Sequence, residues 1–576
     1  MQVPSHAAGK GAFPRIIGLE ETLNRSAVPR PEYPRPNLRR REWSNLNGEW
    51  NFGLGENRLL DRSIIVPFCP QSALSGIDQR ITDDVLWYRR QFDAPAAERL
   101  LLHFGAVDYR ATVWVNGEQV AEHEGGHTPF SADITKVARE TGNEVVVRAE
   151  DPLTDRTIPR GKQYWKPISE GIFYTPTSGI WQTVWLEPLP ERAIGAITVT
   201  PDPAEWAVDI EVEGDGRKEV VATLDGREVG HWRGSGERGR IGLDEVVAWS
   251  PEDPRLYGLD VTLYDRAGRV VDHVASYFAL RTVGVAEGKF LLNGEPYVPR
   301  LVLDQGYFPG GLLTAADDRD LRADILLAKS LGFNGARKHQ KVEDPRWLYW
   351  ADTLGFLAWG EMPGFHQHSA AAERRLEREW EEAVARDRGH PSIVTWAPYN
   401  ESFGLADVEP ETMVRFYDRL YEQTRAGDPT RPVVPNDGWE HSATDLCTVH
   451  DYNPAHALRR RYRGVDTALE PAAHPRPIYL PGYEYGGEPL MVTEFGGVAL
   501  AGGSGFGWLE ASGADELVST YRELVEALMD RGPVEGFCYT QLTDVEQEQN
   551  GLLTFDRRPK ADPELIRAIT ATPKRR

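Results

Sequence analysis

The sequence predicts a multidomain protein with two β-sandwiches followed by a (β/α)8 TIM barrel. With 576 residues, the chain is too long for one ordinary domain, and a barrel takes about 250 residues. Its first half has short alternating strands and Asn- and Gly-rich turns, whereas its second half alternates short apolar strands with amphipathic helices. We therefore expect β-sandwiches over residues 1–190 and 191–284, and the barrel over residues 285–576.

The first half has the features of all-β domains. The segment VNGEQV, Val115 to Val120, predicts a hairpin with its turn at Asn116-Gly117, since both turn residues tolerate positive φ. Further alternating runs are VLWYRRQFDAP and NEVVVRAEDP before residue 190, and EVVATLDGREVGHW and RLYGLDVTLYD after it. The length of the second group favours an immunoglobulin-like sandwich.

The second half has the repeating units of a barrel. Apolar residues on one helical face predict helices over residues 320–332 and 514–532, the latter ending at Gly532-Pro533. Strand candidates, in chain order, are YVPRLVLDQ, GFNGARKH, GFLAWGE, IVTWAPYNE, RPVVPND, LCTVHDY, LMVTEFG and EGFCYTQ. A TIM barrel carries its chemistry at the C-terminal ends of its strands, so residues at these ends are the candidates for a site.

Two of these strands end in a carboxylic acid. Glu401 follows the fourth strand and Glu494 ends the seventh. On a closed barrel both face the same mouth, and a pair of carboxyl groups is what glycoside hydrolysis requires. At about 5–5.5 Å, one attacks the anomeric carbon while the other protonates the departing oxygen. Asn400, beside Glu401, is placed to hydrogen-bond the sugar 2-hydroxyl.

Several motifs make the chain resemble glycoside hydrolase family 2, the family of β-galactosidases, β-glucuronidases and β-mannosidases. The similarity covers nearly the whole chain. Its motifs are WSNLNGEWNF (Trp43 to Phe52), WYRRQF (Trp87 to Phe92), VDYRATVWVNG (Val107 to Gly117), SGIWQTVWLE (Ser178 to Glu187), FLLNGEPY (Phe290 to Tyr297), HPSIVTWAPYNES (His390 to Ser402) and VTEFGG.

The resemblance implies the chemistry and the roles of several residues. It implies a jelly-roll first domain and retaining hydrolysis of a non-reducing terminal sugar, without an organic cofactor. Glu401 would be the acid/base and Glu494 the nucleophile. Tyr452, at the end of the sixth strand, would hydrogen-bond the nucleophile, and His339, at the end of the second, would line the subsite of the cleaved sugar.

Three further strand-end residues are candidates for sugar contacts. Asp304 ends the first strand and is placed to bind a hydroxyl group. Glu361 ends the third strand, where it either binds sugar or supports a neighbouring side chain. Trp439 either stacks on a sugar face or caps the barrel core. His450 and Asp451 are adjacent, but the sequence offers no recognisable set of metal ligands, so we expect no required metal.

The identity of the sugar is the point at which the resemblance weakens. The strand-end segments LVLDQ and RKHQK depart from the family pattern, and the eighth strand lacks the Asn-x-Lys pair that binds glucuronate in β-glucuronidases. Because β-galactosidases are frequent in the family that the chain resembles, a β-galactosidase-like activity is our first expectation. A furanosidase (β-galactofuranosidase or α-L-arabinofuranosidase) is the alternative, followed by a β-glucuronidase in which Arg337, Lys338 or Lys341 replaces the missing pair. A non-catalytic carbohydrate-binding protein is the remaining alternative.

The composition of the chain indicates which binding partners and which cellular compartment to expect. A net charge of −23 disfavours nucleic acid as a partner and weakly disfavours anionic membranes. The N-terminal segment has no apolar signal core, and no run of about 18 apolar residues occurs. Three widely spaced cysteines fit free thiols in a reducing cytosol. We expect a soluble cytoplasmic protein whose β-domains support a dimer or a tetramer.

The two carboxyl groups should also set the pH dependence. Glu401 must be protonated in the first step while Glu494 stays ionised, so we expect a bell-shaped profile with an optimum near neutral or mildly acidic pH. Burial near a second carboxylate should raise the pKa of Glu401.

Overall fold

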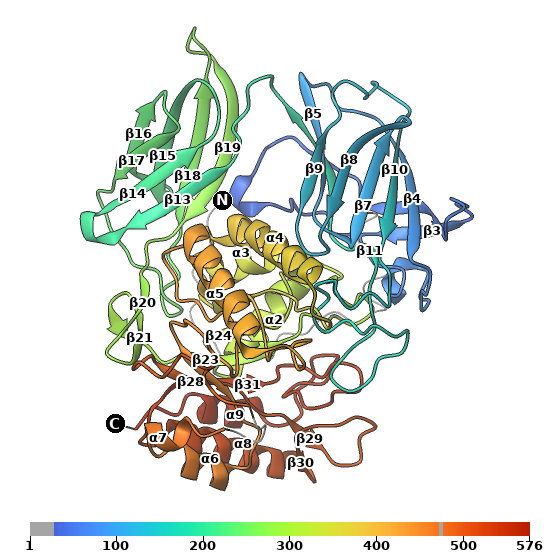
Figure 1. The fold of residues 1–576 in the computed structure, drawn as a ribbon. Helices are drawn as coiled ribbons and strands as arrows, with labels where there is room; N and C mark the ends of the chain where they lie inside the picture. The colour runs from blue at the N-terminus through green and yellow to red at the C-terminus, as the bar shows by residue number, and fades with distance from the viewer. Residues whose placement is uncertain (1–27, 472–475, 576) are drawn as a thin grey trace.

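The computed structural model describes residues 28–471 and 476–575. Figure 1 shows two β-sandwiches side by side above a barrel whose strands and helices occupy the C-terminal half of the chain. The predicted fold class is confirmed: a β-sandwich, an immunoglobulin-like sandwich and a TIM barrel follow one another. The domain boundaries after residues 190 and 284 stay predictions.

The first sandwich pairs a four-stranded sheet, in the order β1-β12-β5-β9, with a six-stranded sheet, in the order β3-β2-β4-β10-β7-β8. Alternate side chains of both sheets, such as Phe52 and Leu102, form one buried apolar core. The predicted hairpin joins β7 to β8, and Asn116 and Gly117 have φ of 52° and 88°. The strands are β1 (Ser44–Asn45), β2 (Gly48–Leu54), β3 (Arg62–Val66), β4 (Val85–Phe92), β5 (Arg99–Phe104), β6 (Val107–Asp108), β7 (Arg110–Val115), β8 (Glu118–Glu124), β9 (Phe130–Asp133), β10 (Asn143–Glu150), β11 (Gly179–Ile180) and β12 (Val184–Leu189).

The second sandwich consists of a three-stranded sheet, β13-β14-β17, and a four-stranded sheet, β16-β15-β18-β19. Their facing apolar side chains form a separate core that includes Val220, Val261 and Phe278. A small sheet, β20-β21-β22, leads from this sandwich into the barrel. The strands are β13 (Ile197–Asp202), β14 (Ala207–Val212), β15 (Arg217–Leu224), β16 (Arg227–Gly234), β17 (Arg238–Gly242), β18 (Tyr257–Tyr264), β19 (Val270–Phe278), β20 (Val283–Ala286), β21 (Lys289–Leu292) and β22 (Glu295–Pro296).

The barrel sheet is parallel and has seven strands in the order β26-β25-β24-β23-β31-β28-β27. The expectation of eight regular strands is wrong at the fifth, RPVVPND, which contributes only isolated bridges at Val433 and Asp437 to the segment that contains β26. Pro432 and Pro435 lack the N–H groups that a continuous ladder needs. The strands are β23 (Arg300–Asp304), β24 (Gly335–Lys338), β25 (Leu357–Glu361), β26 (Ile393–Ala397), β27 (Cys447–His450), β28 (Leu490–Gly496) and β31 (Val534–Thr540).

Amphipathic helices cover the outside of the barrel (Figure 1). Strand residues alternate between this outer layer and an inner core, so Val302 packs toward the helices while Leu301 and Leu303 fill the interior. Both predicted helices form, and the Asp317 side chain caps α2 by accepting from the Arg319 N–H. The helices are α2 (Asp318–Ser330), α3 (Pro345–Leu354), α4 (Ala370–Asp387), α5 (Pro410–Gly427), α6 (Ala455–Arg461), α7 (Val465–Ala468), α8 (Ala514–Met529) and α9 (Pro563–Thr570).

A loop of the first sandwich, residues 151–178, contacts the barrel at the C-terminal ends of its strands. The N–H groups of Arg160 and Gly161 donate to the Gly364 carbonyl at 3.1 and 3.0 Å. On the other side of the loop, the Tyr174 hydroxyl donates to Glu548 at 2.6 Å. The first sandwich therefore forms part of the wall of the barrel mouth.

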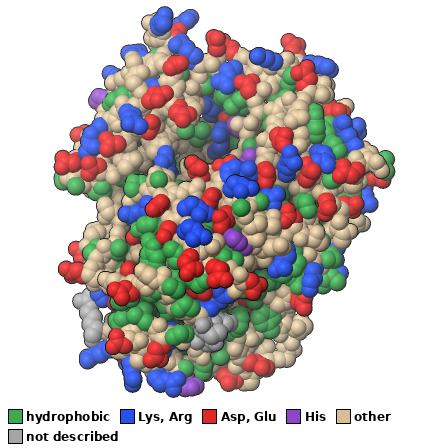
Figure 2. Space-filling view, viewed as in Figure 1, with side chains coloured by type: hydrophobic (Ala, Val, Ile, Leu, Met, Phe, Trp, Pro, Cys, Tyr) green, Lys and Arg blue, Asp and Glu red, His purple; other side chains and the backbone are tan. Residues whose placement is uncertain are grey.

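Several expectations drawn from composition concern the molecule as a whole. Cys69, Cys447 and Cys538 are all buried and free, as predicted. Within the described ranges, no helix is long and apolar enough to cross a membrane. On the face drawn in Figure 2, acidic and basic side chains of the described residues are interspersed rather than gathered by sign. The cytoplasmic location and the oligomeric state stay predictions.

Candidate active site

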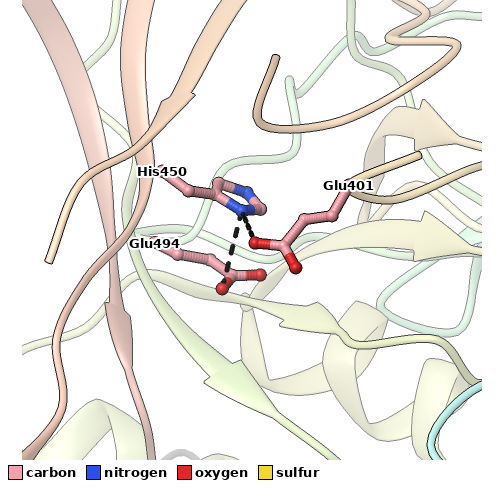
Figure 3. Close-up of side chains that lie close together, drawn as sticks. All are labelled: Glu401, His450 and Glu494. Carbon is pink, nitrogen blue, oxygen red and sulfur yellow. Dashed lines mark hydrogen bonds and ion pairs between the residues drawn. The ribbon is translucent and has the colours of Figure 1, made fainter. Parts of the chain in front are cut away.

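The barrel brings the two predicted carboxyl groups together. Glu494 lies on β28, and Glu401 follows β26 after a short turn. A carboxylate oxygen from each, together with a ring nitrogen of His450, lies in a group whose atoms are all within 4.8 Å of one another. Figure 3 shows the imidazole lying against both carboxylates. This short separation fits the spacing of a retaining glycosidase better than the wider spacing of an inverting one.

The backbone turns sharply where the strand gives way to Glu401. Glu401 and Ser402 have φ of 52° and 51°, in the left-handed region that side-chain-bearing residues seldom adopt. The Glu401 N–H donates to the Asp437 carbonyl at 3.0 Å, and the Ser402 N–H donates to the Asn436 side chain at 3.0 Å. These bonds from the reduced fifth strand hold the strained turn and direct the Glu401 side chain into the mouth.

Glu494 is held by a hydroxyl group and a guanidinium group. The Tyr452 hydroxyl donates to one carboxylate oxygen at 2.6 Å, and Arg337 donates to the other at 3.2 Å. Tyr452 is itself fixed by stacking on Trp508, with ring centroids 4.4 Å apart. Both contacts fix the position of the Glu494 carboxyl group, as a nucleophile requires.

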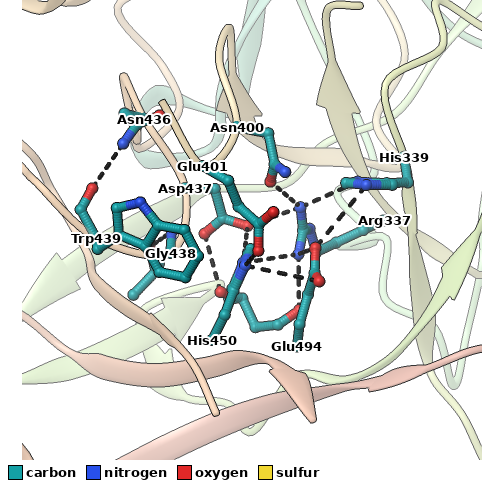
Figure 4. A network of polar contacts seen from close by, with 12 residues as sticks. Arg337, His339, Asn400, Glu401, Asn436, Asp437, Gly438, Trp439, His450 and Glu494 are labelled. Carbon is teal, nitrogen blue, oxygen red and sulfur yellow. Dashed lines mark hydrogen bonds and ion pairs between the residues drawn. The ribbon is translucent and has the colours of Figure 1, made fainter. Parts of the chain in front are cut away.

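Arg337, on β24, is the centre of the network in Figure 4. Its guanidinium is completely buried and forms ion pairs with Glu361 at 2.7 Å, with Asp437 at 2.7 Å and with Glu494 at 3.2 Å. It also donates to the Asn400 side-chain oxygen at 3.1 Å. The positive charge lowers the pKa of Glu361 and of Asp437, against the effect of their burial. These two carboxylates therefore stay ionised inside the barrel.

His450 carries a positive charge between the two candidate catalytic acids. Its Nδ1 lies 2.6 Å from Glu401 and 3.6 Å from Glu494, and its Nε2 lies 3.2 Å from Asp437. Burial lowers the pKa of His450, but the charges of Glu494 and Asp437 outweigh burial and raise that pKa to about 10. The imidazolium therefore persists at neutral pH.

The charge of His450 overturns the expected pKa shift of Glu401. Burial raises the pKa of Glu401, as the sequence suggested, but the hydrogen bond and charge of His450 outweigh it and leave the pKa below its usual value. The expectation of a raised pKa was wrong because the sequence did not reveal a cation at this position. In the free protein, the proton shared by Glu401 and His450 resides on His450. The His450 Nδ1–H group donates it in a short hydrogen bond to Glu401.

The same three side chains are the one group in the described ranges with a geometry that a metal ion could use. A metal would require the Nδ1 atom of His450 without its proton. That proton is held with a pKa of about 10 and is hydrogen-bonded to Glu401. The His450 imidazolium therefore already pairs with these carboxylates. That the protein requires no metal stays our prediction.

The other predicted residues fall into two groups. Asn400 and His339 line the mouth: the Asn400 side-chain nitrogen is buried without a hydrogen-bond partner in the described part of the chain, and His339 Nε2 lies 3.9 Å from Glu494. Glu361, in contrast, accepts from Arg337 at 2.7 Å and contacts His339 at 3.0 Å. It thus has the supporting position that the sequence left as one of two alternatives.

Asp304 and Trp439 also have protein partners. One Asp304 oxygen accepts from Lys338 at 2.8 Å and the other accepts from the Gly306 N–H at 2.8 Å. The Trp439 ring meets His450 edge-on, with centroids 5.6 Å apart. For Trp439 this favours the capping alternative over sugar stacking. The contact of Asp304 with a sugar hydroxyl stays a prediction.

Sequence reasoning missed three residues of the network. Arg337 was considered only as a replacement for the missing Asn-x-Lys pair, His450 only as a metal ligand, and Asp437 not at all. The available signal was their position, since each lies at or just beyond the end of a barrel strand. Their ion pairs join residues far apart in the sequence and could not be read from local spacing.

Comparison with known families decides the assignment. Residues 59–170 match the galactose-binding domain-like model of glycosyl hydrolase family 2, residues 193–281 match the glycosyl hydrolases family 2 model, and residues 285–506 match the TIM barrel domain model of the family. The chain belongs to glycoside hydrolase family 2. It is an O-glycosyl hydrolase, as its sequence motifs suggested.

Individual relatives support the assignment as a glycosidase. A β-glucuronidase of Paenibacillus borealis is 26% identical over 93% of this chain and 98% of its own length. A β-glucuronidase of Canis lupus familiaris is 30% identical, over 66% of this chain and 64% of its own length. The family 2 chain thus spans nearly all of the bacterial relative, but slightly less than two thirds of the mammalian one.

Solved structures share the fold. A β-glucuronidase of Ruminococcus gnavus superposes with a TM-score of 0.77 at 20% identity, covering 94% of this chain and 100% of that one. A β-D-glucuronidase of Dictyoglomus thermophilum gives a TM-score of 0.77 at 20% identity, covering 94% and 99%. At this identity the likeness shows the three-domain fold alone.

Replacing His450 should shift the pH range of the glycosidase. In H450Q the proton must reside on Glu401 itself, whose pKa lies far below that of the imidazolium. The alkaline limb of kcat/KM, which reports the free enzyme, should therefore move from about pH 10 to lower pH. Initial rates measured from pH 4 to 11 would show the shift. H368Q, which removes a partly exposed histidine paired with Glu373, should keep the wild-type limb. An unmoved limb in H450Q would contradict the assignment of this proton.

Replacing Arg337 should destabilise the protein. R337M leaves Glu361, Asp437 and Glu494 buried without their shared cation, so the free energy of unfolding should fall by about 3–5 kcal/mol. Urea unfolding would measure the change. The matched control is R110M, which breaks a half-exposed pair with Glu122 and should change the same quantity by about 0–1 kcal/mol. Equal effects in the two variants would refute a central role for Arg337.

Proposed function

We propose that this family 2 enzyme is a retaining β-glucuronidase in which Glu494 is the nucleophile and Glu401 the acid/base. The observation that carries the catalytic roles is the contrast between the two carboxylates. Glu494 is held by Tyr452 and Arg337, whereas Glu401 shares a proton with His450. One group is therefore prepared to attack and the other to deliver a proton.

The first step forms a covalent glycosyl-enzyme. A Glu494 oxygen attacks the anomeric carbon as the bond from that carbon to the leaving oxygen breaks. The proton of His450 Nδ1 passes to Glu401 across their 2.6 Å contact, and Glu401 passes it on to the leaving oxygen. The unpartnered nitrogen of Asn400 donates to the sugar 2-hydroxyl, a contact that strengthens in the transition state.

The second step reverses the proton flow. Glu401, now ionised beside a neutral His450, accepts a proton from water, and the hydroxide attacks the anomeric carbon and releases Glu494. Two displacements at one carbon return the original anomeric configuration. The pair of Glu401 and His450 ends the cycle with the single proton with which it began.

The sugar assignment rests on the named relatives. Several proteins similar in sequence to this chain are β-glucuronidases, which favours the β-glucuronidase alternative drawn from the sequence over the β-galactosidase-like expectation. Arg337, Lys338 and Lys341 were the candidates to replace the missing Asn-x-Lys pair. Each is bound to a carboxylate of the protein itself, which argues against this role. A glucuronate would need another cation.

Initial rates on a panel of 4-nitrophenyl glycosides test the sugar. We expect kcat/KM for the β-D-glucuronide to exceed that for the β-glucoside, β-galactopyranoside, β-mannoside, β-galactofuranoside and α-L-arabinofuranoside by on the order of 100-fold. A dominant galactoside or furanoside would contradict the glucuronidase proposal and leave the hydrolase assignment intact. No turnover of any substrate would favour the carbohydrate-binding alternative.

Two variants test the catalytic roles on the best substrate of that panel. E494Q should lose turnover by on the order of 10⁴-fold or more, because no covalent intermediate can form. E401Q should lose far less with a 2,4-dinitrophenyl leaving group than with an alkyl one, because the former departs without protonation. Equal losses on both leaving groups in E401Q would refute its role as the acid.

A further inference from the structure

Lys162 is a buried cation for which the protein provides no anion. Its side chain is only 7% exposed, and it lies on the loop by which the first sandwich contacts the barrel. Its ammonium makes no ion pair or hydrogen bond with any residue in ranges 28–471 and 476–575. It lies about 6 Å from the ring centroids of Phe173, Tyr174 and Phe403, at the outer limit of a cation–π contact.

The other buried cations at the mouth are fully engaged. Arg337 binds Glu361, Asp437 and Glu494, and the Lys338 ammonium binds Asp304 at 2.8 Å and Glu343 at 2.7 Å. The Lys341 ammonium binds Glu343 at 2.9 Å and two carbonyl oxygens. These groups obey the general rule that buried charges are paired. Lys162 departs from it, and a buried ammonium without a counter-ion is costly unless a ligand supplies one.

Backbone contacts place Lys162 beside the catalytic carboxylates. Gly161 packs so closely on the barrel that an added Cβ would lie 2.7 Å from the Gln340 carbonyl, next in sequence to His339. Phe403, whose ring faces the ammonium, is two residues beyond Glu401. The charge of Lys162 also contributes to the lowered pKa of Glu401, after burial and the larger effects of His450. The ammonium therefore lies near Glu401, on the side of the mouth that the first sandwich forms.

We propose that the Lys162 ammonium binds the carboxylate of the sugar and thereby selects uronic acids. This assignment rests on the proposed function, and it supplies the cation that the barrel strands of this chain do not offer. The first sandwich then provides a specificity residue for a reaction that the barrel performs. The half-exposed rings of Phe173 and Phe403 lie beside the ammonium, 5.9 and 6.0 Å from it at their centroids.

The decisive comparison uses two substrates that differ only at C6. The quantity is the ratio of kcat/KM for 4-nitrophenyl β-D-glucuronide to that for 4-nitrophenyl β-D-glucoside. K162M, which keeps the length of the side chain without its charge, should lower this ratio by on the order of 10- to 100-fold. K162R should recover part of the loss. An unchanged ratio in K162M, including an equal fall on both substrates, would overturn the proposal.

The matched control lies four residues along the same loop. Lys166 is exposed and pairs with Glu170 at 3.3 Å, so K166M removes an equal charge outside the mouth and should keep the wild-type ratio. Circular dichroism and thermal unfolding verify that each variant is folded. A third substrate, 4-carboxyphenyl β-D-glucoside, carries its carboxylate on the leaving group. If K162M loses that activity while the glucuronide is unaffected, the carboxylate bound is that of the leaving group, and the assignment to the sugar is wrong.

A binding measurement separates failure of this proposal from failure of the proposed function. If the wild-type enzyme does not cleave the glucuronide, the sugar assignment falls, but calorimetric titration with D-glucuronic acid and D-glucose still tests Lys162. Binding of the acid alone, abolished in K162M and retained in K166M, would support a carboxylate site at Lys162. No preference for the acid in the wild-type protein would refute it.

Discussion

The Arg337 guanidinium is the interaction on which the rest of the active site depends. It is wholly buried, and its planar fork reaches carboxylates from three other segments of the barrel, Glu361, Asp437 and Glu494. Without it, these negative charges would repel one another in a medium of low dielectric constant. With it, Glu494 and Glu361 are held where they orient Tyr452 and His339, and Arg337 itself holds Asn400. A lysine in its place would offer charge but could not contact all of these segments at once.

The distribution of protons follows from that arrangement. Asp437, kept ionised by Arg337, is one of the groups that hold His450 protonated, and His450 in turn lowers the pKa of Glu401. Glu401, the proposed acid/base, therefore does not hold the proton on its own carboxyl group. When burial alone raises the pKa of a catalytic acid, the acid itself holds the proton. Glu401 instead draws the proton from a neighbouring imidazolium. Through these successive pKa shifts, the buried Arg337 affects the pH range over which the enzyme is active.

In the function that we propose, the domains divide the tasks of catalysis and substrate selection. The barrel supplies both carboxylates and the ion-pair network, while the loop over residues 151–178 brings Lys162 to the mouth without taking part in the chemistry. The tight contact of Gly161 with the barrel makes this loop a fixed wall, since any side chain there would displace it. A change in the loop could thus alter the sugar that is accepted while the catalytic pair stays in place.

The sequence by itself determined the fold, and it predicted the pair of carboxyl groups that we propose to be catalytic. Both depend on short-range patterns: alternating polarity, helical faces, the turn at Asn116-Gly117, and acids at strand ends, which a barrel must bring to one mouth. Tertiary structure decided the rest. Pro432 and Pro435 reduced one predicted strand to bridges, and the pKa of Glu401 moved opposite to expectation because a cation lay against it. Burial and ion pairing between distant segments set charge states, and neither is visible until the chain has folded.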